Sequence, residues 1–176
     1  MPIPVDVTRA RHDTPGCAEV VHLNNAGAAP PAPVLDAVID HLHLEARLGG
    51  YEAATAAAPK VNAVYESIAR LIGCRPHEVA VVENATRAWD MAFYAMRFGP
   101  GDRILTSRAE YASNVIAFLQ VARRTGAHIE VVDDDEHGQL SVEDLERRLD
   151  DDVKLVAVTH VPTQSGLVNP AAEVGG

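Results

Sequence analysis

The sequence has few cysteines and no long apolar run. Two cysteines, Cys17 and Cys74, in 176 residues cannot form the framework of a disulfide-stapled fold. No stretch reaches the ~20 apolar residues that a membrane-spanning helix needs. The first residues also lack the basic segment and apolar run of a secretory signal. We therefore expect a cytoplasmic protein without disulfides and without a membrane partner.

Basic side chains are also scarce. The 15 lysines and arginines stand against 25 aspartates and glutamates, which gives a formal net charge of -10. Nucleic-acid binders usually carry a basic surplus that displaces counterions from phosphates, so this balance argues against nucleic acid as a partner. The glycine-rich loops that bind dinucleotides and nucleoside triphosphates are missing. The 8 histidines are scattered, and no metal site is expected.

What the sequence does contain is the composition of a folded globular chain, with 47% hydrophobic and 23% charged residues. Apolar spacing predicts helices over 33–47, 59–72, 84–96, 113–124 and 140–149, and strands over 79–82, 103–106, 128–132 and 153–159. Strands that alternate with helices favour an α/β fold with a mostly parallel sheet covered on both faces. Residues 169–174 resemble the opening of another helix, so we expect a chain truncated at its C-terminus.

Local signals mark several element ends. Gly49 and Gly50 end the first predicted helix, and Gly73 is placed as a left-handed cap of the second. Ser141 is placed to cap the helix over 140–149, with Leu140 and Leu145 as a hydrophobic staple across that cap.

The segment 83–87 joins a predicted strand to a predicted helix. Asn84 is a strong capping residue, so we expect the N–H groups of Ala85 and Thr86 to point outward at the positive end of the helix dipole. The Thr86 hydroxyl adds a further donor. Such a turn suits a phosphate group. An ordinary capped helix explains the same residues, and both interpretations stay open on this pattern alone.

Four stretches, taken in order, resemble the N-terminal portion of class V aminotransferases. This branch of the fold-type I pyridoxal-phosphate enzymes includes cysteine desulfurases and isopenicillin N epimerase-like proteins. The stretches are 23–30 (LNNAGAAP), 84–86 (NAT), 110–114 (EYASN) and 160–170 (HVPTQSGLVNP). The resemblance implies an N-terminal arm with a substrate-side loop over 1–32. Over 33–176 it implies the start of the mostly parallel sheet of the cofactor-binding large domain, truncated at the C-terminus.

The resemblance also implies pyridoxal 5'-phosphate (PLP) as the cofactor and assigns roles to single residues. The backbone N–H groups of Ala85 and Thr86 and the Thr86 hydroxyl are expected to hold its phosphate. Tyr111 is expected to stack on the pyridine ring, where many relatives carry histidine. Thr163 is expected to donate to the ring hydroxyl oxygen, where asparagine is common. The substrate-side candidates are Asn25, Ala26, Gly27 and Tyr51, the last facing a neighbouring subunit of the expected homodimer.

Family members also need a lysine that forms the Schiff base and an acidic residue that keeps the pyridine nitrogen protonated. Lys60 lies on a predicted amphipathic helix before the phosphate turn, and Lys154 opens a predicted strand, so neither is placed for this role. The resemblance places both groups downstream of residue 176. We therefore expect no catalytic residue within this chain, and no activity from the chain alone.

These observations favour the N-terminal part of a PLP-dependent, aminotransferase-like enzyme that acts on a small-molecule amino acid. A cysteine desulfurase or C–S lyase of the same fold is the alternative, although neither Cys17 nor Cys74 suits the mobile nucleophile that a desulfurase needs. An epimerase-like activity stays open. So does a function of another class, a non-catalytic α/β module that binds some other anion.

Overall fold

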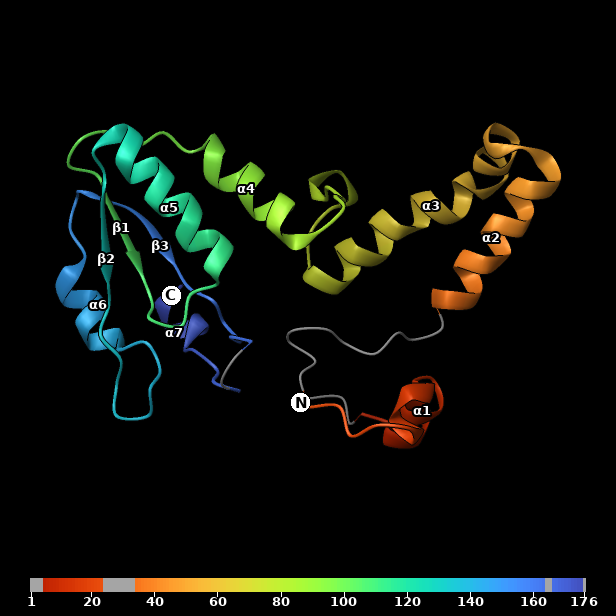
Figure 1. The fold of residues 1–176 in the computed structure, drawn as a ribbon, viewed down its shortest axis with the longest axis horizontal. Helices are drawn as coiled ribbons and strands as arrows, with labels where there is room; N and C mark the ends of the chain where they lie inside the picture. Colours follow the sequence, from red (N-terminus) through yellow and green to blue (C-terminus); the bar gives the residue numbers. More distant parts are fainter. Residues whose placement is uncertain (1–4, 24–33, 164–165, 176) are drawn as a thin grey trace. The chain divides into compact units, whose positions relative to one another are not determined.

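The computed structural model describes residues 5–23, 34–163 and 166–175. The chain divides into two compact units, residues 1–81 and 82–176, and Figure 1 labels their elements. The domain boundary expected at residue 32 lies outside the described residues, as do the site candidates Asn25, Ala26 and Gly27.

The unit of residues 1–81 is helical. The segment expected as an arm contains α1 (Val7–His12), capped by the Asp6 side chain, and the 3₁₀ turn η1 (Pro15–Ala18). The next helices are α2 (Val34–Leu48) and α3 (Gly50–Ile72), followed by the 3₁₀ turn η2 (Pro76–Glu78). α2 confirms the helix predicted over 33–47.

The second predicted helix starts earlier than the sequence indicated. α3 begins at Gly50 rather than at Pro59, which lies inside the helix. The alanine-rich residues 53–58 favour helix strongly enough to continue the helix through a proline that lacks an N–H donor. Gly73 adopts a left-handed φ of 73° and caps α3, as predicted.

The unit of residues 82–176 is built on three parallel strands, β1 (Arg103–Thr106), β2 (His128–Val131) and β3 (Val153–Ala157), in the order β2-β1-β3. Its helices are α4 (Ala85–Ala95), α5 (Ala112–Thr125), α6 (Val142–Arg148) and α7 (Ala171–Val174). The predicted α/β class and the parallel sheet are therefore confirmed.

The two faces of this sheet bury separate apolar clusters. On one face, Ile104 of β1 packs in a cluster with Phe93 of α4 and Phe118 of α5. On the other face, the next residue of the strand, Leu105, packs in a cluster with Leu145 of α6. Successive strand residues point to opposite faces, so this division shows helices covering both sides of the sheet.

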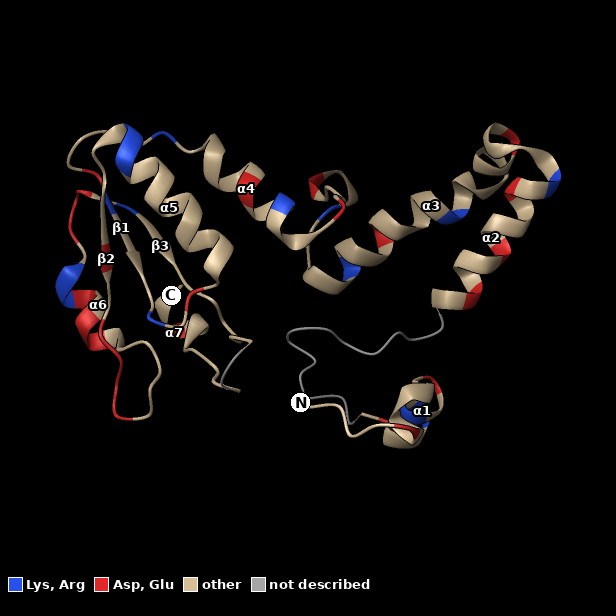
Figure 2. Cartoon of the chain, in the orientation of Figure 1, with Lys and Arg blue, Asp and Glu red and all other residues tan. Residues whose placement is uncertain are grey.

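α6 begins at the predicted cap. Ser141 Oγ accepts a hydrogen bond from the Asp144 N–H at 3.2 Å. Leu140 and Leu145 both lie buried in one cluster, as the predicted staple requires. Figure 2 shows acidic residues in the first turn of α6 and basic residues in its last turn, which complements the helix dipole.

The strand predicted over 79–82 is wrong. Val79 has extended backbone angles, but residues 79–82 form no strand, and Val81 is 54% exposed. An extended apolar run becomes a strand only where a neighbouring strand takes its hydrogen bonds. Within the described residues, the only sheet consists of β1, β2 and β3, so this segment has no strand partner there.

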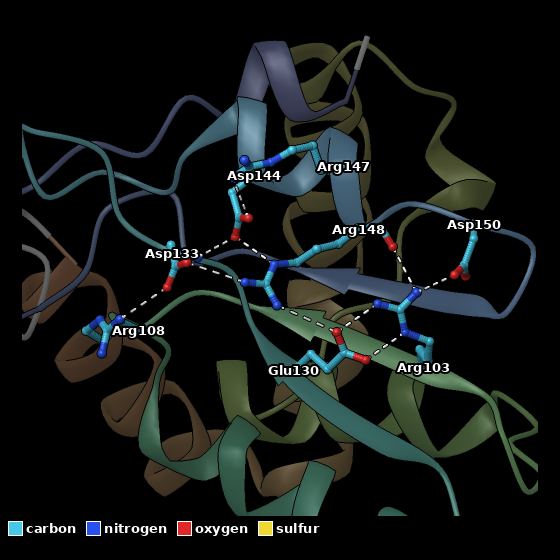
Figure 3. A network of polar contacts seen from close by, with 8 residues as sticks. All are labelled: Arg103, Arg108, Glu130, Asp133, Asp144, Arg147, Arg148 and Asp150. Carbon is cyan, nitrogen blue, oxygen red and sulfur yellow. Dashed lines mark hydrogen bonds and ion pairs between the residues drawn. The ribbon is translucent and has the colours of Figure 1, made fainter.

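An ion-pair network ties the sheet to α6 (Figure 3). Arg103 on β1 donates from Nε and Nη2 to the two carboxylate oxygens of Glu130 on β2, each at 2.7 Å. Arg103 Nη1 donates to Asp150 at 2.6 Å. Arg148 of α6 donates from Nε to Asp144 at 2.6 Å and lies 3.7 Å from Glu130. The network therefore joins two strands, a helix and the loop before β3.

Candidate functional site

The carboxyl ends of β1 and β3 form the candidate site. β1 lies between β2 and β3 in the sheet. The chain runs from β1 through α5 to β2, and then from β2 through α6 to β3 on the opposite side of β1. In open α/β sheets, ligands bind in the crevice beyond the carboxyl ends of such strands. α4 precedes β1 and α5 follows it, and Figure 1 shows the first turn of α5 at this end of the sheet.

The first turn of α4 presents open backbone donors. The Asn84 side chain accepts the Arg87 N–H at 2.8 Å, and the Asn84 carbonyl accepts the Ala88 N–H at 3.1 Å. The N–H groups of Ala85 and Thr86 meet no acceptor in the described part of the chain, and both residues are exposed. The predicted cap is thus confirmed. Two open amides and a hydroxyl at a helix N-terminus are a donor set that fits a phosphate dianion.

Tyr111 lies at the start of α5, where it is the N-cap residue and is 49% exposed. Its backbone N–H donates to Glu110 Oε1 at 2.6 Å, and its carbonyl accepts the N–H groups of Asn114 at 2.9 Å and Val115 at 3.2 Å. The backbone of Tyr111 is therefore fixed on both sides, while its ring keeps an exposed face.

Thr163 is half-buried in the segment that follows β3. Asn169, which is 1% exposed, closes this segment. Its backbone N–H donates to the His160 carbonyl at 2.8 Å, and its Nδ2 donates to the Thr159 carbonyl at 2.7 Å. Asn169 Oδ1 accepts the Leu140 N–H at 3.0 Å. The segment that carries Thr163 is thus tied to the core at both ends.

Two buried hydroxyls at the same edge have no hydrogen-bond partner among the described residues. Ser107 directly follows β1 and is 4% exposed, and Ser113 lies in the first turn of α5. Most buried polar atoms are hydrogen-bonded, so unsatisfied donors at this edge agree with a site for a polar ligand. Sequence reasoning missed both serines because nothing local distinguishes them.

The remaining candidates belong to other elements of the chain. Tyr51 is on α3 in the unit of residues 1–81 and is 92% exposed. Its place at a subunit interface stays a prediction. Lys60 also belongs to that unit. Lys154 is an exposed residue near the amino end of β3, away from the carboxyl edge. The described residues contain no group of three side chains that could hold a metal ion, and none of their helices is long and apolar enough to cross a membrane.

The chain is similar to known proteins over most of its length. The sequence model of the family described as Aminotransferase class-V matches residues 20–176. The chain is 28% identical to a cysteine desulfurase of Haloferax volcanii, over 97% of this chain and 46% of that protein. It therefore spans about half the length of the curated relatives it matches.

Two solved structures share the fold. The apo structure of cysteine desulfurase from Thermococcus onnurineus NA1 matches with a TM-score of 0.80 at 23% identity, over 99% of this chain and 45% of that one. A mutant of C-DES, a cystine C–S lyase, holds glycine covalently linked to its PLP cofactor. It matches with a TM-score of 0.80 at 20% identity, over 94% of this chain and 44% of that one.

Proposed function

Since the chain belongs to the class-V aminotransferase family, we propose that it forms the phosphate- and ring-binding part of a PLP-dependent enzyme that acts on an amino acid. The open N–H groups of Ala85 and Thr86 at the start of α4 carry this proposal. A PLP cofactor in the similar C-DES structure supports it.

The residues of this chain have binding and orienting roles in the proposal. Ala85 and Thr86 donate to the phosphate, and Tyr111 lies against the pyridine ring. The Thr163 hydroxyl donates to the ring oxygen. When bound, PLP supplies an electron sink for a reacting amino acid. Tyr111 fixes the plane of the ring, and an orientation fixed in advance lowers the entropic part of the barrier.

The first candidate reaction is cleavage of a C–S bond in cysteine or a cysteine conjugate, because the relatives named above are cysteine desulfurases and a cystine C–S lyase. Transamination, the first expectation from the sequence, gains no support from these relatives. It is kept as the second candidate because the matching family model is described as Aminotransferase class-V. Cys17 and Cys74 do not decide between the two reactions, because the chain spans under half the length of the desulfurases that it matches.

The compounds that the full-length protein forms in the presence of PLP distinguish these reactions. With L-cysteine and an added thiol reductant, a desulfurase yields alanine and sulfide. A lyase yields pyruvate, ammonia and sulfide from the same substrate. An aminotransferase converts an added 2-oxo acid to its amino acid and releases no sulfide. If none of these products forms from cysteine, cystine or common amino donors, the assignment as an amino-acid enzyme is contradicted.

The phosphate turn is tested on the chain itself by equilibrium dialysis with PLP. Ala85→Pro removes one of the two open N–H groups, and proline suits this first helical position because Asn84 before it is extended. We expect about tenfold weaker PLP binding, as for one charge-assisted hydrogen bond. Val142→Pro makes the same change at the first position of α6 and should leave binding unchanged. Equal effects of the two variants would count against the α4 turn as the phosphate site.

A further inference from the structure

One carboxylate accepts four hydrogen bonds from three segments at the carboxyl edge of the sheet. Glu110 Oε1 accepts from the Tyr111 backbone N–H at 2.6 Å, from Asn114 Nδ2 at 3.0 Å and from the Thr159 hydroxyl at 2.6 Å. Glu110 Oε2 accepts from the Thr106 hydroxyl at 3.2 Å. The donors come from the end of β1, the start of α5, which supplies two of them, and the segment after β3.

This arrangement exceeds what capping a helix needs. A capping side chain satisfies one or two open N–H groups of its own helix. Glu110 also bonds Thr106, which is 3% exposed at the end of β1, and Thr159, which lies 49 positions away in sequence. Hydrogen bonds to an ionised acceptor are about twice as strong as neutral ones, so the half-buried carboxylate holds these segments in one arrangement.

The same contacts reach the segment that carries Thr163. Thr159 donates its hydroxyl to Glu110 and accepts the Asn169 Nδ2 at its carbonyl, at 2.7 Å. Asn169 in turn binds the His160 carbonyl through its backbone N–H. Glu110 is thus bonded directly to Tyr111 and, through Thr159, to the base of the loop with Thr163. Figure 1 shows the first turn of α5 and the segment after β3 at the same end of the sheet.

We propose that Glu110 is a positioning residue, which sets the orientation of the Tyr111 ring and couples it to the Thr163 loop. The inference rests on the proposed function, because it concerns how a bound pyridine ring is held. Glu110 itself touches neither the phosphate turn of α4 nor, in this proposal, the cofactor. Its loss therefore affects recognition of the ring and spares recognition of the phosphate.

The test compares two ligands on three variants of the chain. Glu110→Ala removes all four hydrogen bonds, and Glu110→Gln keeps the size and one acceptor oxygen while removing the charge. Glu143→Gln changes an exposed glutamate on α6 and is the control. Dissociation constants are measured for PLP and for inorganic phosphate. The circular dichroism of the bound PLP band reports the orientation of the ring.

We expect Glu110→Ala to weaken PLP binding about 3- to 10-fold, the value of one aromatic stack, with phosphate binding unchanged and the dichroism band altered. The PLP affinity of Glu110→Gln should lie between those of Glu110→Ala and the wild type. If Glu110→Ala does not fold, the test is made on Glu110→Gln. Glu143→Gln should match the wild type. If the Glu110 variants lose affinity for PLP and for phosphate to the same extent, or if both keep the wild-type dichroism band, the positioning role of Glu110 is overturned. Either result leaves the proposed function standing. A wild-type chain that does not bind PLP would instead reject the proposed function.

Discussion

Arg103 on β1 and Glu130 on β2 form a bidentate ion pair between neighbouring strands, with both N···O distances at 2.7 Å. Lysine has no planar fork and cannot reproduce this geometry. We predict that Arg103→Lys lowers the midpoint of urea unfolding, followed by the fluorescence of Trp89. Arg75→Lys alters an exposed pair with Glu78 on η2 and should produce a smaller shift. Equal shifts would show that the network adds nothing beyond a surface ion pair.

The same network predicts acid sensitivity. The Arg103 guanidinium holds the pKa of Glu130 below its usual 4.5, and the Asp133 N–H together with Arg148 lowers the pKa of Asp144 below 3.8. A carboxyl whose pKa is lower in the folded state stabilises the fold above its unfolded pKa and loses this effect as the pH falls. We therefore predict falling stability from about pH 5 downward, across the usual carboxyl pKa values. Asp144→Asn should flatten this dependence, whereas Asp36→Asn, at an exposed site on α2, should not.

The aromatic cluster of α4 and α5 should be sensitive to truncation. Phe118 is fully buried, and its ring lies 5.4 Å from those of both Phe93 and Trp89. We predict that Phe118→Ala destabilises the fold by about 3–5 kcal/mol, the usual cost of a large core cavity. Trp89 is the single tryptophan of the chain, so its fluorescence follows the change. Leu119→Ala, at a neighbouring position that is 58% exposed, should cost less than about 0.5 kcal/mol.

The cap of α4 should serve both stability and binding. We predict that Asn84→Ala destabilises the fold by about 1 kcal/mol and also weakens PLP binding, because the first turn loses its fixed position. Ser141→Ala removes the equivalent cap of α6, with a similar loss of stability and no loss of binding. Denaturant unfolding and dialysis measure the two effects separately. Unchanged PLP affinity in the Asn84 variant would show that the Asn84 cap is not needed for PLP binding.

The buried Asn169 should be hard to replace. Both ends of its side-chain amide are hydrogen-bonded, to the Leu140 N–H and the Thr159 carbonyl. Asn169→Leu leaves these two groups unsatisfied, so we predict a loss of about 2–4 kcal/mol. Asn62→Leu, at an exposed position of α3, is the matched control. A similar stability for the two variants would show that the loop does not depend on Asn169.

Local patterns predicted much of this fold. The strand over 103–106 and the caps at Asn84 and Ser141 follow from apolar spacing and capping chemistry within a few residues. The segment 79–82 shows the limit, because an apolar run does not reveal whether a neighbouring strand exists to pair with it. The resemblance to class V aminotransferases is confirmed by the family match.

The candidate site was harder to predict. The open donors of Ala85 and Thr86 follow from one capped helix, whereas the roles of Glu110 and Asn169 come from contacts across the fold. Glu110 meets Thr159 from 49 positions away, and Asn169 meets the Leu140 N–H from 29 positions away. No local periodicity encodes such pairs. Only the parallel sheet brings these segments to one edge.

The central claim is that the N–H groups of Ala85 and Thr86 hold the PLP phosphate, and amide NMR of the isotopically labelled chain tests it most directly. On titration with PLP, the account predicts that these two amide signals shift downfield. Inorganic phosphate should shift the same signals, whereas pyridoxal without the phosphate should leave them in place. Saturable PLP binding that moves other signals and leaves those of Ala85 and Thr86 unchanged would contradict the account.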